Sequence, residues 1–260
     1  MRRVAGRGRA RPSRAGVRGV ASAVVDTSRR VGWWLLLPAL LIAVTPAIVH
    51  AARDATADPP TSLAAATLTG KRTVSGPVCI DQAQDVSGSM KRYAAQRDEA
   101  VAQLLSFATR ELRGDDLLAE AVFAGTSEVT LPPTSLHTVG AARRPAAAIE
   151  DGSLLSPAVD ALSATPHGSC AAKALVAVTD GQIFDDPAEL GAKLKGARYS
   201  RVYLMIPGVH WTQSGDAISE LPPNVTVRYF RGPDELGVAF GEVAAALTGE
   251  RLSTRKKGAP

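Results

Sequence analysis

An uncharged, apolar stretch at residues 31–52 decides how much of the chain can fold as a soluble domain. It contains no Lys, Arg, Asp or Glu, and as a helix it would be about 33 Å long, enough to cross a hydrocarbon core of about 30 Å. Residues 1–30 carry nine Arg against a single acidic residue, Asp26. Because strongly basic flanks stay in the cytoplasm, we predict a transmembrane signal anchor that places the rest of the chain outside the cytoplasm.

A cleaved signal peptide is the alternative for the same stretch. The run Val49-His50-Ala51 would then supply the cleavage site, near Ala51. The apolar span is longer than the usual signal-peptide core of about 7–15 residues, which favours the anchor. Either alternative exports the remaining chain, tethered to the cell membrane in the first case and secreted in the second.

The net charge of +5 comes from the two ends of the chain and does not indicate nucleic-acid binding. Residues 31–250 hold 17 Lys and Arg against 24 Asp and Glu. An acidic body is a poor binder of polyanions and a suitable host for a cation. Aromatic residues are only 5% of the chain, too few for platforms on which bases stack. We therefore expect no nucleic acid among the partners.

Composition divides the chain into five segments. These are a basic cytoplasmic arm (1–30), the anchor (31–52), a linker (53–76), a folded domain (77–250) and a basic tail (251–260). The linker is rich in Ala, Thr, Asp and Pro and has no clean hydrophobic period, which is typical of a spacer.

Within the folded domain, apolar runs of strand length alternate with helical patterns. This alternation is typical of a parallel α/β sheet. We expect strands at 78–84, 117–123, 129–131, 174–178, 201–206 and 225–230, and helices at 91–112, 157–164, 187–194 and 235–247. The second and third strands are expected to form a hairpin around Gly125.

Carboxylate and hydroxyl residues follow two of the expected strands. Asp85, Ser87 and Ser89 lie between the first strand and its helix, and Asp180 follows the strand at 174–178. Ligands of open parallel sheets bind at the carboxyl ends of strands, where the strand order reverses. Oxygen ligands of this kind suit Mg²⁺, Mn²⁺ or Ca²⁺. Two neutral hydroxyls would hold the ion directly and leave it electrophilic, with an open position for an Asp or Glu of a protein partner.

These residues resemble the metal-ion-dependent adhesion site, or MIDAS, of the von Willebrand factor type A (VWA) family. The resemblance rests on Asp-Val-Ser-Gly-Ser-Met at 85–90 and Thr-Asp-Gly at 179–181, and it covers residues 75–250. It implies a Rossmann-like, doubly wound and mostly parallel sheet with helices on both faces. The family also places a Thr on the metal from an intervening loop, which Ser153 would replace here. The predicted metal ligands are Asp85, Ser87, Ser89, Ser153 and Asp180, with Mg²⁺ expected ahead of Mn²⁺ and Ca²⁺.

Together with the predicted anchor, the resemblance leads us to expect a membrane-tethered, extracytoplasmic domain that binds a protein partner through a divalent cation. A metal-free VWA domain with a structural role in an envelope complex is the alternative. A hydrolase on the same sheet is a third class. The sequence has no Gly-x-Ser-x-Gly, His-Glu-x-x-His or P-loop motif, so we expect no enzyme.

The first strand departs from the family pattern because it is polar. A central strand of a parallel sheet is normally apolar, yet this one contains Asp81, Gln82 and Gln84. Burying each would cost about 1–3 kcal/mol unless it finds a hydrogen-bond partner. A more open sheet, a buried polar network and an atypical metal site all remain open as explanations.

The two cysteines allow two states. In a VWA-like strand order, the strands near Cys79 and Cys170 are neighbours about 4.8 Å apart, which allows a disulfide. The bond requires the chain around Gly168 to turn back toward the sheet, and export would favour it. Two buried free thiols are the alternative.

Two further carboxylates, Asp185 and Asp186, follow the second motif. They could hold a second ion beside Asp180. Helix capping explains Asp186 without an ion, because Pro187 and Glu189 follow it in the order expected at a helix start.

Overall fold

The computed structural model describes residues 59–143, 152–208 and 224–255. The chain divides into two compact units at residues 55 and 56, and every described residue belongs to the second unit. Among those residues, no helix combines the length and the apolar character needed to cross a membrane. The predicted arm and anchor, residues 1–52, lie outside the described residues.

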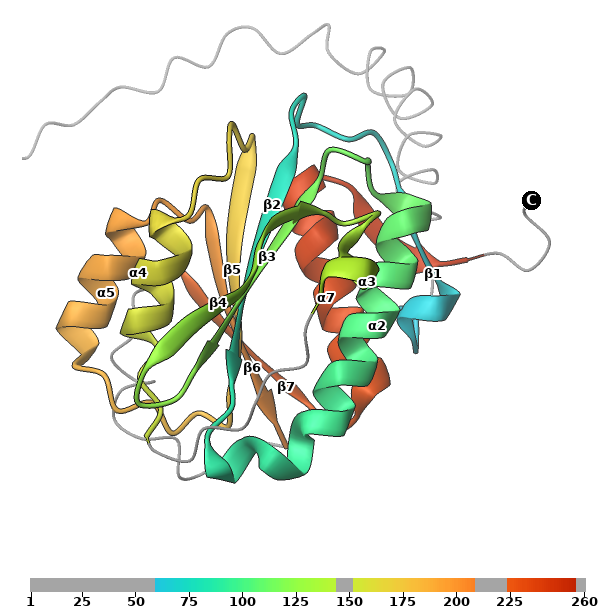
Figure 1. Cartoon of the computed structure of the whole chain (residues 1–260). Coiled ribbons are helices and arrows are strands. Elements are labelled where there is room, and N and C mark those ends of the chain that lie inside the picture. Colours follow the sequence, from blue (N-terminus) through green and yellow to red (C-terminus); the bar gives the residue numbers. More distant parts are fainter. Residues whose placement is uncertain (1–58, 144–151, 209–223, 256–260) are drawn as a thin grey trace, which may run out of the picture. The chain divides into compact units, whose positions relative to one another are not determined.

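A six-stranded sheet runs through the centre of the second unit (Figure 1). Its strands are β2 (Val78–Asp85), β3 (Leu117–Phe123), β4 (Ser127–Ser135), β5 (Ala172–Val178), β6 (Arg201–Pro207) and β7 (Val225–Phe230). They lie in the order β4-β3-β2-β5-β6-β7, and only the β3–β4 pair is antiparallel. The mostly parallel sheet confirms the prediction, and its order reverses between β2 and β5.

Helices cover both faces of the sheet, as predicted (Figure 1). One face packs against α2 (Ala94–Glu111) and α7 (Pro233–Thr248), and the other packs against α4 (Ser156–Ala164) and α5 (Pro187–Gly196). The helix expected at 91–112 begins instead as a 3₁₀ helix, η2 (Gly88–Tyr93), before α2 starts. A short α3 (Val139–Ala142) follows β4.

The folded unit begins earlier and ends later than the sequence predicts. A short helix η1 (Leu63–Ala65) and strand β1 (Ala66–Thr69) lie in the segment expected to be a linker, and β1 pairs with β8 (Arg251–Thr254) in the expected tail. A glycine of α7 explains this packing. A Cβ atom on Gly241 would lie 2.5 Å from Leu63 Cδ1 and 3.1 Å from Leu252, so its absence lets both leucines cover the helix.

A buried ion pair ties the end of the expected linker, at Arg72, to the sheet. Arg72 donates to both carboxylate oxygens of Asp116, at 2.8 and 2.7 Å. Asp116 also accepts main-chain N–H bonds from Val78 and Arg113. Burial alone would raise the pKa of Asp116, but these bonds hold that pKa below its ordinary value.

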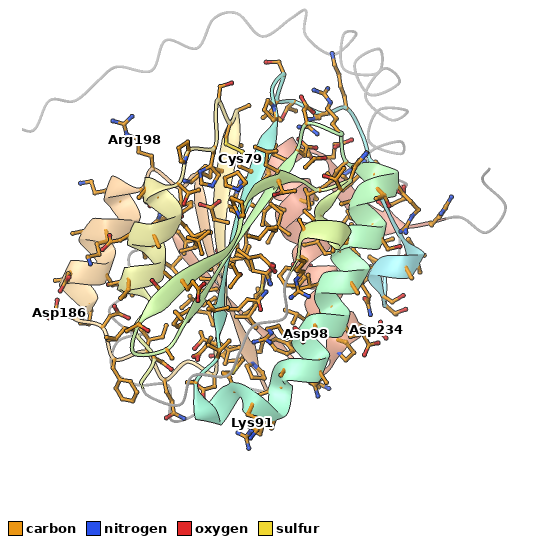
Figure 2. All side chains as sticks on the ribbon, viewed as in Figure 1. Cys79, Lys91, Asp98, Asp186, Arg198 and Asp234 are labelled. Carbon is orange, nitrogen blue, oxygen red and sulfur yellow. A yellow bond between two sulfur atoms is a disulfide. The ribbon has the colours of Figure 1, made fainter. Side chains whose placement is uncertain are left out.

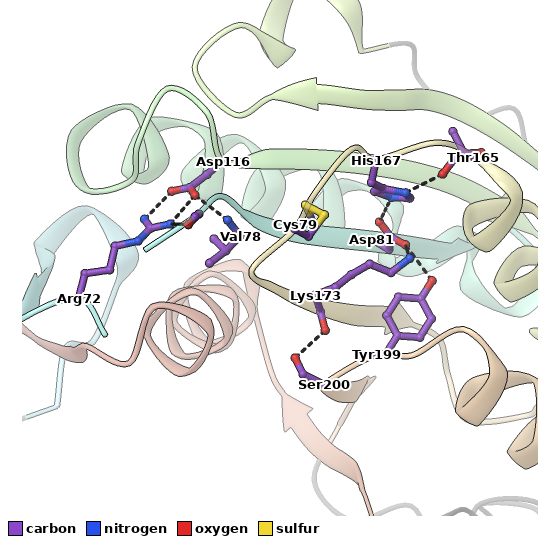
Figure 3. The surroundings of a disulfide bond; sticks show 12 residues. Arg72, Val78, Cys79, Asp81, Asp116, Thr165, His167, Lys173, Tyr199 and Ser200 are labelled. Carbon is purple, nitrogen blue, oxygen red and sulfur yellow. Dashed lines mark hydrogen bonds and ion pairs between the residues drawn. A yellow bond between two sulfur atoms is a disulfide. The ribbon is translucent and has the colours of Figure 1, made fainter. Parts of the chain in front are cut away.

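The polar central strand is buried along its whole length, since every one of the eight residues of β2 is buried. Asp81 is surrounded by donors: Tyr199 donates its hydroxyl at 2.8 Å, His167 Nε2 lies at 2.5 Å and Lys173 Nζ lies at 3.2 Å (Figure 3). Tyr199 stays a protonated donor here, since burial and then the neighbouring carboxylate raise its pKa. The sheet is therefore not open at this point, and a polar network replaces apolar packing.

A second network satisfies Gln84 on the opposite face of β2. Gln84 donates to Glu120 at 2.6 Å, and Glu120 accepts from Arg143 Nε at 3.0 Å. Gln82 is the exception, because neither polar atom of its amide has a hydrogen-bond partner among the described residues.

Cys79 and Cys170 form a disulfide, with Cα atoms 5.8 Å apart (Figure 3). The bond confirms the first of the two states expected from the sequence. Gly168 has φ = +71°, a left-handed conformation that glycine adopts without steric cost. The following segment then returns to the sheet, where Ala171 donates its N–H to the Pro77 carbonyl at 2.7 Å.

We predict that replacing both cysteines with serine lowers the free energy of unfolding by up to about 4–5 kcal/mol, because the bond spans 91 residues and so restricts the unfolded chain. Denaturant unfolding followed by circular dichroism measures the change. Reductant should destabilise the wild type by a similar amount and leave the double variant unaffected. Equal stability of wild type and variant in oxidising buffer would contradict the prediction.

Candidate metal centre

The predicted site residues gather at the carboxyl ends of β2 and β5, where the strand order reverses. Asp85 is the last residue of β2, and Ser87 directly precedes η2. Asp180 follows β5, and Ser153 lies in the loop before α4. The topology of the sheet therefore brings together residues from three separate loops.

The Asp85 carboxylate is the centre of the cluster. Its Oδ1 accepts the Ser87 N–H at 2.9 Å, and its Oδ2 accepts hydroxyls from Ser153 at 3.1 Å and Thr179 at 2.8 Å. The hydroxyl oxygens of Ser87 and Ser89 are 3.2 Å apart. Four of the five predicted residues are thus linked by hydrogen bonds. Thr179 joins them, although the sequence pattern marked it only as part of the Thr-Asp-Gly motif.

Asp180 stands beside this cluster with one unsatisfied oxygen. The residue is 2% exposed, and its Oδ1 accepts the Gln182 N–H at 3.0 Å. Its Oδ2 is buried and has no hydrogen-bond partner among the described residues. A buried carboxylate oxygen without a donor is costly, and a cation or its bound water would relieve that cost.

Burial makes an ionised Asp85 unfavourable. Desolvation raises its pKa, and the bonds from Ser87, Thr179 and Ser153 offset this only in part. A raised pKa means that the folded state binds the proton more tightly than the unfolded chain. The stability gained from that proton is present below the unfolded pKa and is lost as the pH rises through the folded value. At neutral pH the charge therefore costs stability.

The donors around Asp85 are neutral. Arg97 Nη1 donates to the main-chain carbonyl of Asp85 at 3.2 Å and not to its carboxylate. Within the described ranges, no group of three or more His, Cys, Asp or Glu could hold a metal. The predicted ligands differ from such a group because most of them are hydroxyls. Their oxygen atoms fit a hard divalent cation.

Asp185 has a structural role that the sequence did not predict, because its sequence position suggested only a ligand of a second ion. Its carboxylate accepts the N–H groups of Leu155 at 2.6 Å and Ser156 at 2.8 Å. The N–H of Phe184 donates to the Ser153 carbonyl at 2.9 Å. The loop after β5 therefore clamps the loop that carries Ser153.

This clamp explains Asp185 without a second ion, because both of its oxygens are occupied by main-chain donors. Asp186 caps α5 by accepting the Glu189 N–H at 2.9 Å, which confirms the capping prediction. The clamp could not be found from the sequence, because Asp185 and its partners are about 30 residues apart and no local pattern relates them.

We predict different effects for the two neighbouring Asp→Asn changes. Asp185→Asn turns one acceptor into an NH₂ group facing a buried N–H, and should cost about 1–3 kcal/mol of unfolding free energy. Asp186→Asn is the matched control, because Asn is an equally good helix cap. Denaturant unfolding tests stability, and hydrogen exchange at the Leu155 and Ser156 amides should quicken in the first variant alone. Equal behaviour of the two variants would contradict the clamp.

Comparison with known proteins identifies the fold. No protein-family model matches the sequence, and no curated protein sequence matches it. The chain is similar to the conserved hypothetical protein BatB from Bacteroides thetaiotaomicron, with 14% identity, a TM-score of 0.51 and coverage of 66% of this chain and 99% of that one. It is also similar to von Willebrand factor type A from Catenulispora acidiphila, with 19% identity, a TM-score of 0.50 and coverage of 70% and 47%.

A third similar structure is that of proximal thread matrix protein 1 from the mussel byssus, with a zinc-occupied MIDAS motif. It is 14% identical, with a TM-score of 0.51 and coverage of 75% of this chain and 52% of that one. These likenesses agree with the sheet order and with helices on both faces. The described unit therefore has a VWA-type fold.

Proposed function

We propose that this chain is a membrane-tethered, extracytoplasmic VWA-type protein that binds a protein partner through a divalent cation. The ligands are Asp85, Ser87, Ser89, Ser153 and Asp180, acting directly or through water. The observation that carries the proposal is the convergence of hydroxyls from separate loops on Asp85, beside the unpartnered oxygen of Asp180.

The chemistry of the site favours a hard cation. Carboxylate and hydroxyl oxygens suit Mg²⁺, Mn²⁺ or Ca²⁺, whereas zinc prefers nitrogen and sulfur ligands. Zinc occupies the MIDAS motif of the similar mussel protein, which supports a divalent cation as the ligand here. We expect the two carboxylates to act through bound water, so that they screen the charge of the ion only in part and leave an electrophilic centre for an incoming anion.

The open side of the site favours a partner carboxylate. Asp85, Ser153 and Asp180 are almost inaccessible, whereas Ser89 is exposed. An Asp or Glu of a partner protein can therefore approach from the Ser89 side and complete the coordination of the ion.

Two features support the location outside the cytoplasm. The nine-Arg arm before residues 31–52 favours a cytoplasmic N-terminus. The disulfide between Cys79 and Cys170 suits an oxidising compartment.

The topology is tested by a reporter fused after Pro260. We expect alkaline phosphatase at this position to be active, because it matures only outside the cytoplasm. Deleting residues 31–52 should abolish the activity and serves as the control. A reporter that works only in the cytoplasm would reverse the proposed orientation.

The metal is tested by thermal unfolding of the full-length protein in detergent. We expect Mg²⁺ or Mn²⁺ to raise the melting temperature of the wild type, because a ligand at 100 times its Kd adds about 2.7 kcal/mol. Asp85→Asn should abolish this rise. In EDTA at pH 7 the variant should be at least as stable as the wild type, because it removes a buried charge. A wild type that ignores both metals would favour the metal-free structural alternative.

A further inference from the structure

The candidate metal centre is bordered by two features that metal binding does not require. Lys91 and Arg92 lie on η2, two and three residues after Ser89, and before α2. Phe184 lies in the loop after β5, on the side of α4 and α5. Helix α2 packs against one face of the sheet, and α4 and α5 pack against the other, so the two features lie on either side of the site.

Neither of the two cations has a carboxylate partner among the residues that the structure describes. Both are exposed, and together with Gly88 and Ser89 they line an open hollow. Within the described part of the chain Lys91 makes no ion pair, and Arg92 only places its guanidinium 4.7 Å from the centre of the Tyr93 ring. Figure 2 shows Lys91 at the end of the sheet opposite Cys79.

The positive charges of Lys91 and Arg92 repel a bound metal ion unless an anion lies between them and the ion. Like charges close together repel, so Lys91 and Arg92 lower the affinity of the empty site for a cation. The same charges attract a partner that brings more negative charge than the single carboxylate needed by the ion. Their position therefore favours an acidic segment.

Phe184 offers an apolar contact that is already fixed in place. It is 68% exposed, although the neighbouring Ile183 and Asp185 are both buried. Its N–H is bonded to Ser153, and Asp185 is bonded to the start of α4. The backbone on both sides of Phe184 is thus anchored. The ring can therefore contact an apolar partner with little further loss of conformational entropy in this loop.

We infer that the partner presents a short segment with three recognition groups: a carboxylate for the ion, a second acidic residue beside Lys91 and Arg92, and a large apolar residue beside Phe184. This inference rests on the proposed function and specifies the partner that the same site accepts. The carboxylate supplies the metal bond, and the flanking groups supply selectivity between acidic segments.

Selection from a phage-displayed random peptide library tests the inference. The full-length protein is immobilised in detergent with Mn²⁺, and bound phage are eluted with EDTA. Peptides selected by the wild type should contain two acidic residues and a large apolar residue. Selection on the double variant Lys91→Gln, Arg92→Gln should lose the preference for the second acid, and selection on Phe184→Ser should lose the apolar preference.

Binding of the best selected peptide provides the matched controls. The double variant and Phe184→Ser should each weaken it about 2–5-fold, the scale of exposed contacts. Lys195→Gln, at the far end of α5, and Phe184→Leu should leave it unchanged. The inference would be overturned if the EDTA-eluted peptides had the same flanking residues for every variant. That result would still support the metal bridge. Recovery of no EDTA-dependent peptide would count against the metal bridge itself and thus against both proposals.

Discussion

The structure depends on burying a polar strand at the centre of a parallel sheet. β2 is inaccessible along its whole length, yet four of its eight side chains are Asp or Gln. A buried polar group must be matched by donors or acceptors. For Asp81, Gln84 and Asp85, neighbouring strands and the loops at both ends of β2 supply these partners, so the strand helps to determine where those loops are held.

The two aspartates of this strand are satisfied in different ways. At the amino end, Asp81 contacts Lys173, His167 and the Tyr199 hydroxyl, so the Lys173 cation balances its charge. At the carboxyl end, Asp85 meets hydroxyl and main-chain donors, which bind a carboxylate without neutralising it. The first arrangement is complete in the protein alone. The second leaves a buried negative charge that a cation can balance.

Sequence patterns predicted the features that are encoded by neighbouring residues, namely the strands and the two short motifs of the candidate site. Runs of strand length between helical patterns located all six strands of the main sheet, and the motifs at 85–90 and 179–181 located most of the candidate site. Strands β1 and β8 were missed because they have four residues each and pair across nearly the whole domain.

Side-chain partners were harder to predict than strands. The clamp by Asp185 depends on main-chain groups about 30 residues away, which no local pattern encodes. The polar strand left three explanations open, and only the three-dimensional positions of Tyr199 and Glu120 distinguish between them. Gln82 fits none of the networks found among the described residues.

The disulfide also gives the domain a covalent topology that bears on proteolysis. The bond closes a ring from residue 79 to residue 170, which contains Asp85, Ser87, Ser89 and Ser153 but not Asp180. A single peptide-bond cleavage inside that ring leaves one molecule with all five residues still connected. Such a nicked chain would migrate as two fragments only after reduction, whereas a cut outside the ring would release a fragment without reductant.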